Sequence, residues 1–153
     1  MDKDFIDIKL KFDEDKGYFD IGITGNGDIE ADNSFDSTLI LALHTDGRAS
    51  DTEVLSADRQ RGTIVDLFSR ARNGSKLWLL EQSRNDVSAR NCVTDYVKSA
   101  LSFLVNKGFA KSVDVSAKIT AKGIIYSIIL YRVNGVTNKY AYRAWDNSIY
   151  REN

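Results

Sequence analysis

The hydrophobic pattern of the chain changes its period near residue 110, and no other feature constrains the fold as strongly. Between the capping residues Asn85–Asp86 and Gly108, apolar residues recur at spacings of three and four, which is typical of an amphipathic helix. The apolar positions are Ala89, Val93, Tyr96, Val97, Ala100, Leu101 and Leu104. We predict one long helix of roughly twenty residues over this stretch.

After residue 110, apolar and polar residues alternate, as they do in a β-strand with one buried face. The alternating stretches are Val113–Thr120, Ile124–Tyr131 and Val136–Trp145, separated by turns at Ala121–Gly123 and Asn134–Gly135. Asn-Gly is a strong hairpin signal because both central residues of the turn need positive φ. We predict a three-stranded antiparallel sheet whose apolar face is covered by the long helix.

The N-terminal region predicts a β-hairpin and a first helix. Residues 5–12 and 18–23 alternate in hydrophobicity on either side of a polar turn. Asn33 or Ser34 is placed to cap a helix that carries Leu39, Ile40 and Leu43 on one face. The expected fold is therefore a single α+β domain over 1–153, with an N-terminal β-hairpin, two to three helices including one long helix, and a C-terminal three-stranded antiparallel sheet.

Two segments lie between the first helix and the long one. The stretch from Arg48 to Gly62 is polar and aperiodic, so we expect a long exposed loop, a kind of segment that often carries function. The apolar turn that follows Ser75 is expected to be buried on most sides. Its core residues are Leu77, Trp78 and Leu80.

Charge and composition exclude several kinds of partner. The chain has 21 Lys and Arg against 22 Asp and Glu, a formal charge of −1, so no global field attracts nucleic acid or anionic lipid. No apolar run reaches the ~20 residues of a membrane span, and Met1–Asp4 lacks the features of a secretory signal. We expect no nucleic-acid or membrane partner and a protein made and kept in a cytoplasm.

The residues that catalysis or metal binding would need are scarce. The chain has one cysteine, Cys92, expected to be an inert thiol buried on the long helix, and one histidine, His44, at the end of the first helix. A Ser-His-Asp arrangement lacks its Gly-x-Ser-x-Gly elbow, and no metal or cofactor motif is present. Glu81 is the single candidate for a buried catalytic acid.

The loop residues Asp58, Arg59, Arg61 and Gly62 form the one singular polar motif. Two guanidinium groups beside a carboxylate and a flexible glycine can make bidentate contacts with carboxylates of a partner protein. A solvated loop with no partner is the alternative.

Several motifs together carry a resemblance to a known family. They are Gly27-Asp28-Ile29, the block Thr38–Ala49, Arg61-Gly62 with Asp66, and the block Gly74–Leu80, followed by the long helix and the sheet. In these motifs the chain resembles the small baseplate wedge proteins of contractile-tailed phages, in the Mu-like branch of the family related to the T4 lysozyme-like wedge subunit and the sheath initiators. The likeness spans residues 5–146. Thr63-Ile64 stand where two tryptophans usually follow the Arg-Gly pair.

The resemblance implies a structural protein of the virion tail baseplate, assembled in the host bacterial cytoplasm. Its implied partners are a larger baseplate wedge protein, the tail sheath protein and the central spike or hub, with multiple copies in a ring. The implied mechanism is strand addition at an open edge of the C-terminal sheet. Arg59 and Arg61 would hold the wedge partner, and Trp78 would support the core. A lysozyme-like peptidoglycan hydrolase and a cytoplasmic adaptor on the same fold are the alternatives.

Overall fold

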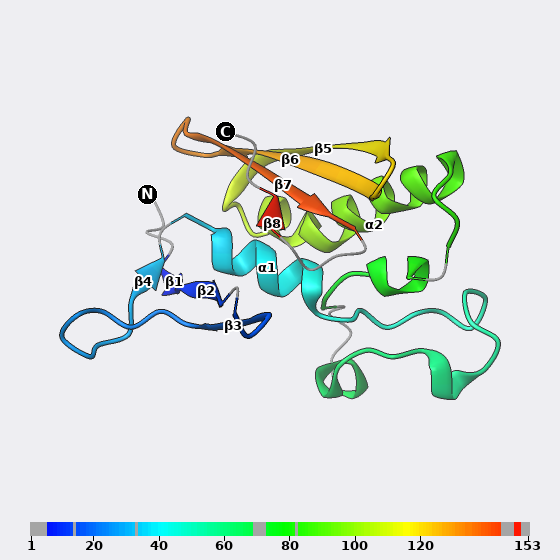
Figure 1. Cartoon of the computed structure of the whole chain (residues 1–153), viewed down its shortest axis with the longest axis horizontal. Coiled ribbons are helices and arrows are strands. Elements are labelled where there is room, and N and C mark those ends of the chain that lie inside the picture. Colours follow the sequence, from blue (N-terminus) through cyan, green and yellow to red (C-terminus); the bar gives the residue numbers. More distant parts are fainter. Residues whose placement is uncertain are drawn as a thin grey trace. The chain divides into compact units, whose positions relative to one another are not determined.

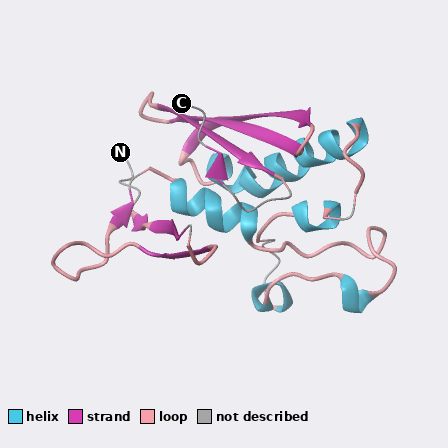
Figure 2. Cartoon of the chain, viewed as in Figure 1, coloured by secondary structure: helices cyan, strands magenta, loops and turns pink. Residues whose placement is uncertain are grey.

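The computed structural model describes residues 6–13, 15–32, 34–68, 73–81, 83–144 and 149–150 (Figure 1). The chain divides into two compact units, Met1–Leu41 and Ala42–Asn153. Short strands dominate the first unit, and the second contains the long helix and the large sheet (Figure 2). Helices and antiparallel strands occupy separate stretches of the chain, which confirms the α+β class. A single domain over 1–153 stays a prediction.

The N-terminal unit contains the predicted hairpin. Its strands are β1 (Asp7–Ile8), β2 (Leu10–Asp13), β3 (Tyr18–Ile21) and β4 (Ala31–Asp32). β2 pairs with β3 and β1 pairs with β4, both antiparallel. Of the predicted first strand, residue 5 lies outside the described residues.

Helix α1 (Asp36–His44) crosses the boundary between the two units. Its predicted apolar residues Leu39, Ile40 and Leu43 are all buried. The residue before it, Phe35, is buried with φ +70°, a left-handed conformation that is uncommon for a bulky side chain.

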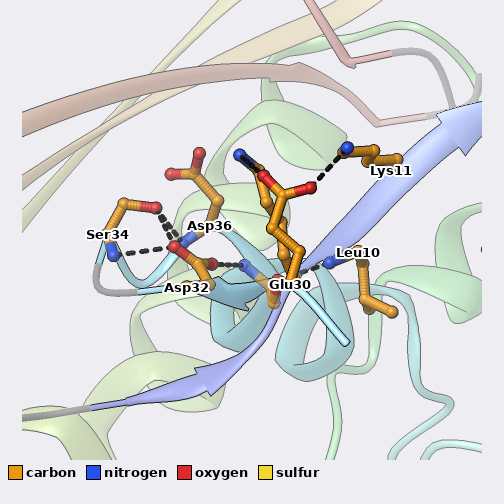
Figure 3. A network of polar contacts seen from close by, with 8 residues as sticks. Leu10, Lys11, Glu30, Asp32, Ser34 and Asp36 are labelled. Atoms are coloured by element: carbon orange, nitrogen blue, oxygen red, sulfur yellow. Dashed lines mark hydrogen bonds and ion pairs between the residues drawn. The ribbon is translucent and has the colours of Figure 1, made fainter. Parts of the chain in front are cut away.

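The start of α1 is held by an aspartate that the sequence reading did not single out (Figure 3). The buried Asp32 accepts hydrogen bonds from the backbone N–H groups of Ser37 at 3.0 Å and Ser34 at 2.8 Å. Burial raises the pKa of Asp32, but these bonds and that of the Ser34 hydroxyl outweigh it and lower the pKa. Ser34 itself accepts a bond from the N–H of Asp36 at 3.3 Å, while the alternative cap Asn33 lies outside the described residues.

The long helix α2 (Val87–Asn106) lies where the sequence predicts it. Asp86 caps its start by accepting a bond from the N–H of Ala89 at 2.9 Å. At its end Gly108 adopts φ +75°, and the N–H of Phe109 donates to the carbonyl of Leu104 at 2.9 Å. This Schellman turn ends the helix and starts the sheet within three residues.

The C-terminal sheet contains the three predicted strands and a fourth. Its strands are β5 (Ala110–Thr120), β6 (Gly123–Arg132), β7 (Thr137–Arg143) and β8 (Ile149–Tyr150), antiparallel in that order. Two pairs join β7 to the unpredicted β8. The predicted end of the third strand at Trp145 lies outside the described residues.

One face of this sheet packs on α2 and forms the core of the second unit. Ile124, Tyr126, Ile128 and Leu130 on β6 are at most 1% exposed, and they alternate with half-buried residues of the opposite face. The facing side chains of α2, including Val93 and Leu101, are fully buried. The alternate residues of β6 and the apolar residues spaced three and four apart on α2 therefore form one core, as predicted.

Candidate partner-binding surface

Two segments far apart in the sequence pair side by side, in parallel, beside the end of α1. The N–H of Ser75 donates to the carbonyl of Thr45 at 2.9 Å, and the N–H of Gly47 donates to the carbonyl of Ser75 at 2.7 Å. Gly74 adopts φ +80°, and a Cβ at this residue would lie 2.3 Å from the oxygen of Thr45. This pairing therefore requires glycine at 74, and it joins two of the sequence blocks that carry the family resemblance, Thr38–Ala49 and Gly74–Leu80.

Beside this paired stretch, an arginine lies over an indole ring, between two carboxylates. Arg61 Cζ lies 4.6 Å from the ring centroid of Trp78. The same guanidinium donates to Asp46 at 3.0 Å and to Glu81 at 3.3 Å. Trp78 Nε1 donates to the carbonyl of Gly47 at 2.8 Å, which fixes the ring under the arginine. We name Asp46, Arg61, Trp78 and Glu81 the Arg61 cluster.

The backbone of Arg61 is unusual as well. Arg61 has φ +46° and Gly62 has φ +100°, so two successive left-handed residues turn the chain at this point. A Cβ at Gly62 would lie 2.8 Å from the Cβ of Arg48. The hydrogen bonds to Glu81 and then Asp46 raise the pKa of Arg61. Ion pairs of Arg61 with Asp46 and Glu81 thus hold the end of the loop in place.

The four residues predicted to bind a partner are divided by this geometry. Asp58 and Arg59 lie on the exposed turn η1 (Ala57–Arg59). Arg61 and the half-buried Gly62 shape the loop itself, since the side chain of Arg61 engages Asp46 and Glu81. Contact of any of the four with a partner stays a prediction.

The predicted core turn is the 3₁₀ helix η3 (Leu77–Leu80). Leu80 is buried, whereas Leu77 and Trp78 are half-buried. The turn is less buried than the sequence predicts, and the ring of Trp78 is covered by the side chain of Arg61, which is itself exposed. Ser75 Oγ accepts a bond from the N–H of Leu77 at 3.4 Å and donates one to the carbonyl of Leu43 at 2.6 Å.

The segment from Arg48 to Gly62 is not exposed throughout, contrary to the prediction. Gln60 is 5% exposed, and its side-chain amide accepts from Arg48 and donates to Asp51. The N–H of Ala49, also buried, donates to the carbonyl of Gln60 at 2.9 Å. A polar loop can bury one residue whose hydrogen bonds are all satisfied, and no sequence pattern distinguishes that glutamine.

A second ion pair ties this segment to η3. Lys76 Nζ lies 2.7 Å from Glu53 Oε2, which also accepts from the N–H and the hydroxyl of Ser50, each at 2.8 Å. Burial raises the pKa of Glu53, but the bonds from Lys76 and Ser50 outweigh it and lower the pKa to about 2. Glu53 therefore stays ionised at every physiological pH.

Large apolar side chains are exposed in this segment and in the turn that follows it. Leu55 is 94% exposed, Phe68 85% and Ile64 73%. Ile64 is the first residue of the 3₁₀ helix η2 (Ile64–Leu67), and Phe68 follows its last residue; Thr63 and Asp66 cap the start of η2. Large exposed apolar side chains of this kind are candidates for contact with another protein.

The residues weighed for chemistry lie in unremarkable surroundings. Glu81, the candidate acid, has 58% of its side chain exposed and binds Arg61. The carboxyl groups with clear pKa shifts in the described part of the chain, those of Glu30, Asp32 and Glu53, are all lowered, whereas a catalytic acid needs a raised pKa.

The remaining candidates give no metal or membrane site. Cys92 is half-buried on α2, so the prediction of a buried thiol is wrong in degree. Among the described residues, no group of three or more His, Cys, Asp or Glu is placed to hold a metal ion. The helices described here are too short or too polar to cross a bilayer.

The sheet offers a second kind of surface at the β5 edge. β5 is an outer strand of eleven residues, and in the described part of the chain it pairs only with β6. At the opposite edge, β8 pairs with Ala141 and Tyr142 of β7. The longer unpaired edge among the described strands is therefore that of β5.

The comparisons with known proteins agree on a family. The sequence model of the family described as "Phage protein GP46" matches residues 35–137, a stretch that runs from α1 through the Arg61 cluster and α2 to the start of β7. The chain is 27% identical over 139 residues to "Baseplate protein gp46" of Escherichia phage Mu, which covers 84% of this chain and 96% of that protein.

A second relative comes from a bacterial genome. The chain is 27% identical over 124 residues to "Mu-like prophage FluMu protein gp46" of Haemophilus influenzae, which covers 80% of this chain and 86% of that protein. Since the family model matches about two thirds of the sequence, the chain belongs to the GP46 family of phage proteins.

Proposed function

We propose that this chain is a structural, non-enzymatic component of a contractile phage tail baseplate, present in several copies around the tail and joining the wedge ring to the first ring of the sheath. Support comes from the family match and from the baseplate name of the Mu relative. The proposed place of action is the virion baseplate, after assembly in the host cytoplasm.

The unpaired edge of β5 is the observation that carries the proposed joint to the sheath. An outer strand presents a row of N–H and C=O groups to which an extended arm of another chain can add as the next strand. Eleven residues exceed the five to six of a typical strand, so a partner arm has ample length to pair with.

The register identifies which peptide groups are available on β5. The N–H of Ala144, just beyond β7, donates to the carbonyl of Ile124 at 2.8 Å. The N–H and C=O groups of even-numbered β6 residues therefore point toward β7, and those of odd-numbered residues point toward β5. Ile125, Ser127 and Ile129 pair with Lys118, Ser116 and Asp114. The peptide groups of Val113, Val115, Ala117 and Ile119 therefore point to the outside.

The segment Arg48–Phe68 is the proposed contact with the wedge protein. The exposed side chains of Leu55 and Phe68 supply apolar anchors, and Asp58 and Arg59 supply charged contacts. Arg61 acts by holding the loop in its bent form through the Arg61 cluster.

Proline substitution on β5 tests the proposed strand addition. Ala117→Pro removes one outward N–H without removing a bond to β6, whereas Ala117→Val keeps that N–H. In binding assays with the sheath protein encoded by the same phage, we expect the Pro variant to lose binding and the Val variant to retain it. Equal binding by both would contradict strand addition.

Hydrogen exchange on the unmodified protein gives an independent measurement. The amides of Val113, Val115, Ala117 and Ile119 should exchange quickly in the free protein and slowly in the complex with the sheath protein. Amides that stay fast in a formed complex would place the contact elsewhere.

An activity assay addresses the alternative of peptidoglycan hydrolysis. We expect no turnover of purified peptidoglycan by the full chain. Turnover that is lost in Glu81→Gln would overturn the non-enzymatic role.

A further inference from the structure

The formal charges of the two units are opposite, although they nearly cancel in the whole chain. Residues 1–41 contain four lysines and eleven Asp and Glu, a formal charge of −7, and residues 42–153 contain seventeen Lys and Arg and eleven Asp and Glu, a formal charge of +6. Opposite fields of this size on two units of one molecule attract the unlike units of neighbouring molecules.

The acidic unit carries an exposed apolar face. Pairing of Ile8 with Ala31, Leu10 with Ile21 and Ile23 with Ile29 puts these side chains on one side of the strands. Four isoleucines of this face remain 45–57% exposed: Ile8, Ile21, Ile23 and Ile29. We name these four residues the isoleucine face.

Polar interactions of the N-terminal unit gather on the opposite side of its strands. There Lys9 and Lys11 pair with Glu30, and Asp32 holds the start of α1 (Figure 3). Among the described strand residues, the charged side chains lie on this opposite side, and the isoleucine face carries none. The exposed Asp15 and Asp28 lie in the turns at its borders.

The basic unit carries a matching face on its sheet. The side of β6 turned away from α2 presents Ile125, Ile129 and Tyr131, all half-buried. The pairing places Lys118 of β5 and Lys139 of β7 beside this apolar row, and both lysines are exposed. They outnumber the one carboxylate that the described strands place on this side, Asp114. We name this surface the outer sheet face.

We propose that the isoleucine face of one copy docks on the outer sheet face of a second copy. Two apolar sheet faces pack at a separation of about 10 Å, and the acidic turns of one copy meet the lysines of the next. The two surfaces differ, so the contact is heterologous and joins successive copies head to tail into a ring or an open filament. This adds to the proposed function a direct contact between copies, which strand addition to the sheath does not require.

Sedimentation equilibrium of the full chain tests the contact. We expect self-association in about 0.1 M salt that weakens in about 1 M salt, because the Debye length falls from about 10 Å to about 3 Å. Ile23→Asn combined with Ile29→Asn should weaken it roughly tenfold or more. Leu55→Asn is the control, since Leu55 is also aliphatic and is even more exposed, at 94%, but belongs to neither face.

A charge exchange identifies the two surfaces. We expect Lys118→Glu/Lys139→Glu alone and Asp15→Lys/Asp28→Lys alone to stay monomeric, and a mixture of the two variants to associate. A wild-type chain that is monomeric at every concentration overturns the proposal. If that monomer also becomes more expanded in the charge variants, the two faces dock within one chain, and docking between copies is likewise overturned. A mixture that fails to associate overturns it too. Neither result depends on the sheath protein, so the proposed strand addition is tested separately.

Discussion

The helix-and-sheet body of the second unit and the segment before it, residues 45–81, are stabilised in different ways. In the body, fully buried aliphatic side chains of α2 pack against alternate residues of β6. In the segment, glycines with positive φ, ion pairs and one buried glutamine hold the backbone, while leucine and phenylalanine side chains are exposed. Apolar burial therefore stabilises the body, whereas local polar bonds and backbone turns shape a segment that leaves large apolar side chains exposed.

The largest expected effect lies in the body. Leu101→Ala removes a side chain with no exposed area and leaves a cavity under the sheet, so we expect a loss of roughly 2 to 5 kcal/mol in the free energy of unfolding. Urea denaturation followed by circular dichroism measures it. A loss below about 1 kcal/mol would mean that apolar burial does not dominate the body.

A backbone change should have the next largest effect, in the segment. Gly74→Ala forces a Cβ against the carbonyl of Thr45 and into a left-handed φ, at a cost of roughly 1 to 3 kcal/mol. We expect limited proteolysis to cut residues 45–81 sooner while the sheet persists. Uniform loss of the whole fold instead would show that the two regions unfold together.

One hydrogen bond accounts for the third prediction. Trp78→Phe keeps an aromatic floor for Arg61 but loses the bond to the carbonyl of Gly47, so we expect a loss of about 1 kcal/mol. The shift of the thermal midpoint measures it, with Trp78→Ala as the larger companion change. An unchanged midpoint would show that the bond adds nothing to the segment.

The smallest expected effect is on the pH dependence. The pKa of Glu53 is about 2 in the folded chain and near 4.5 when unfolded, so its stabilising contribution is present above pH 4.5 and is lost as the pH falls toward 2. Glu53→Gln should flatten the stability profile in this window, and Asp58→Asn, a change at an exposed carboxylate of the same segment, is the control. If Glu53→Gln left the pH dependence of stability unchanged, the ion pair between Glu53 and Lys76 would not stabilise the segment.

The sequence predicts the body well and the segment poorly, for a physical reason. Leu101 and Ile128 belong to patterns that repeat along their elements, and repetition makes them readable. The interactions of Gln60, of Glu53 and of Arg61 with Trp78 each occur once and join residues that are separated in sequence. No periodic pattern predicts them. The same holds for β8, whose two residues pair with β7 without any pattern of their own.

The candidate site shows both cases. Arg61, Gly62 and Trp78 are each predicted from the sequence, because the loop motif and the apolar turn are recognisable one at a time. Their assembly depends on the pairing of the segments that contain Thr45 and Ser75, which no sequence pattern indicates. The exposure of Leu55 and Phe68 could not be predicted either, because the sequence of a loop does not show whether its apolar side chains are covered.

The three-residue passage from α2 to β5 has a consequence for assembly. The outer strand is fastened at one end by the turn at Gly108 and at the other by the tight hairpin between Thr120 and Gly123. A strand anchored at both ends has little freedom to slide or fray. An incoming arm would meet a rigid template, so most of the conformational entropy lost on pairing would be that of the arm.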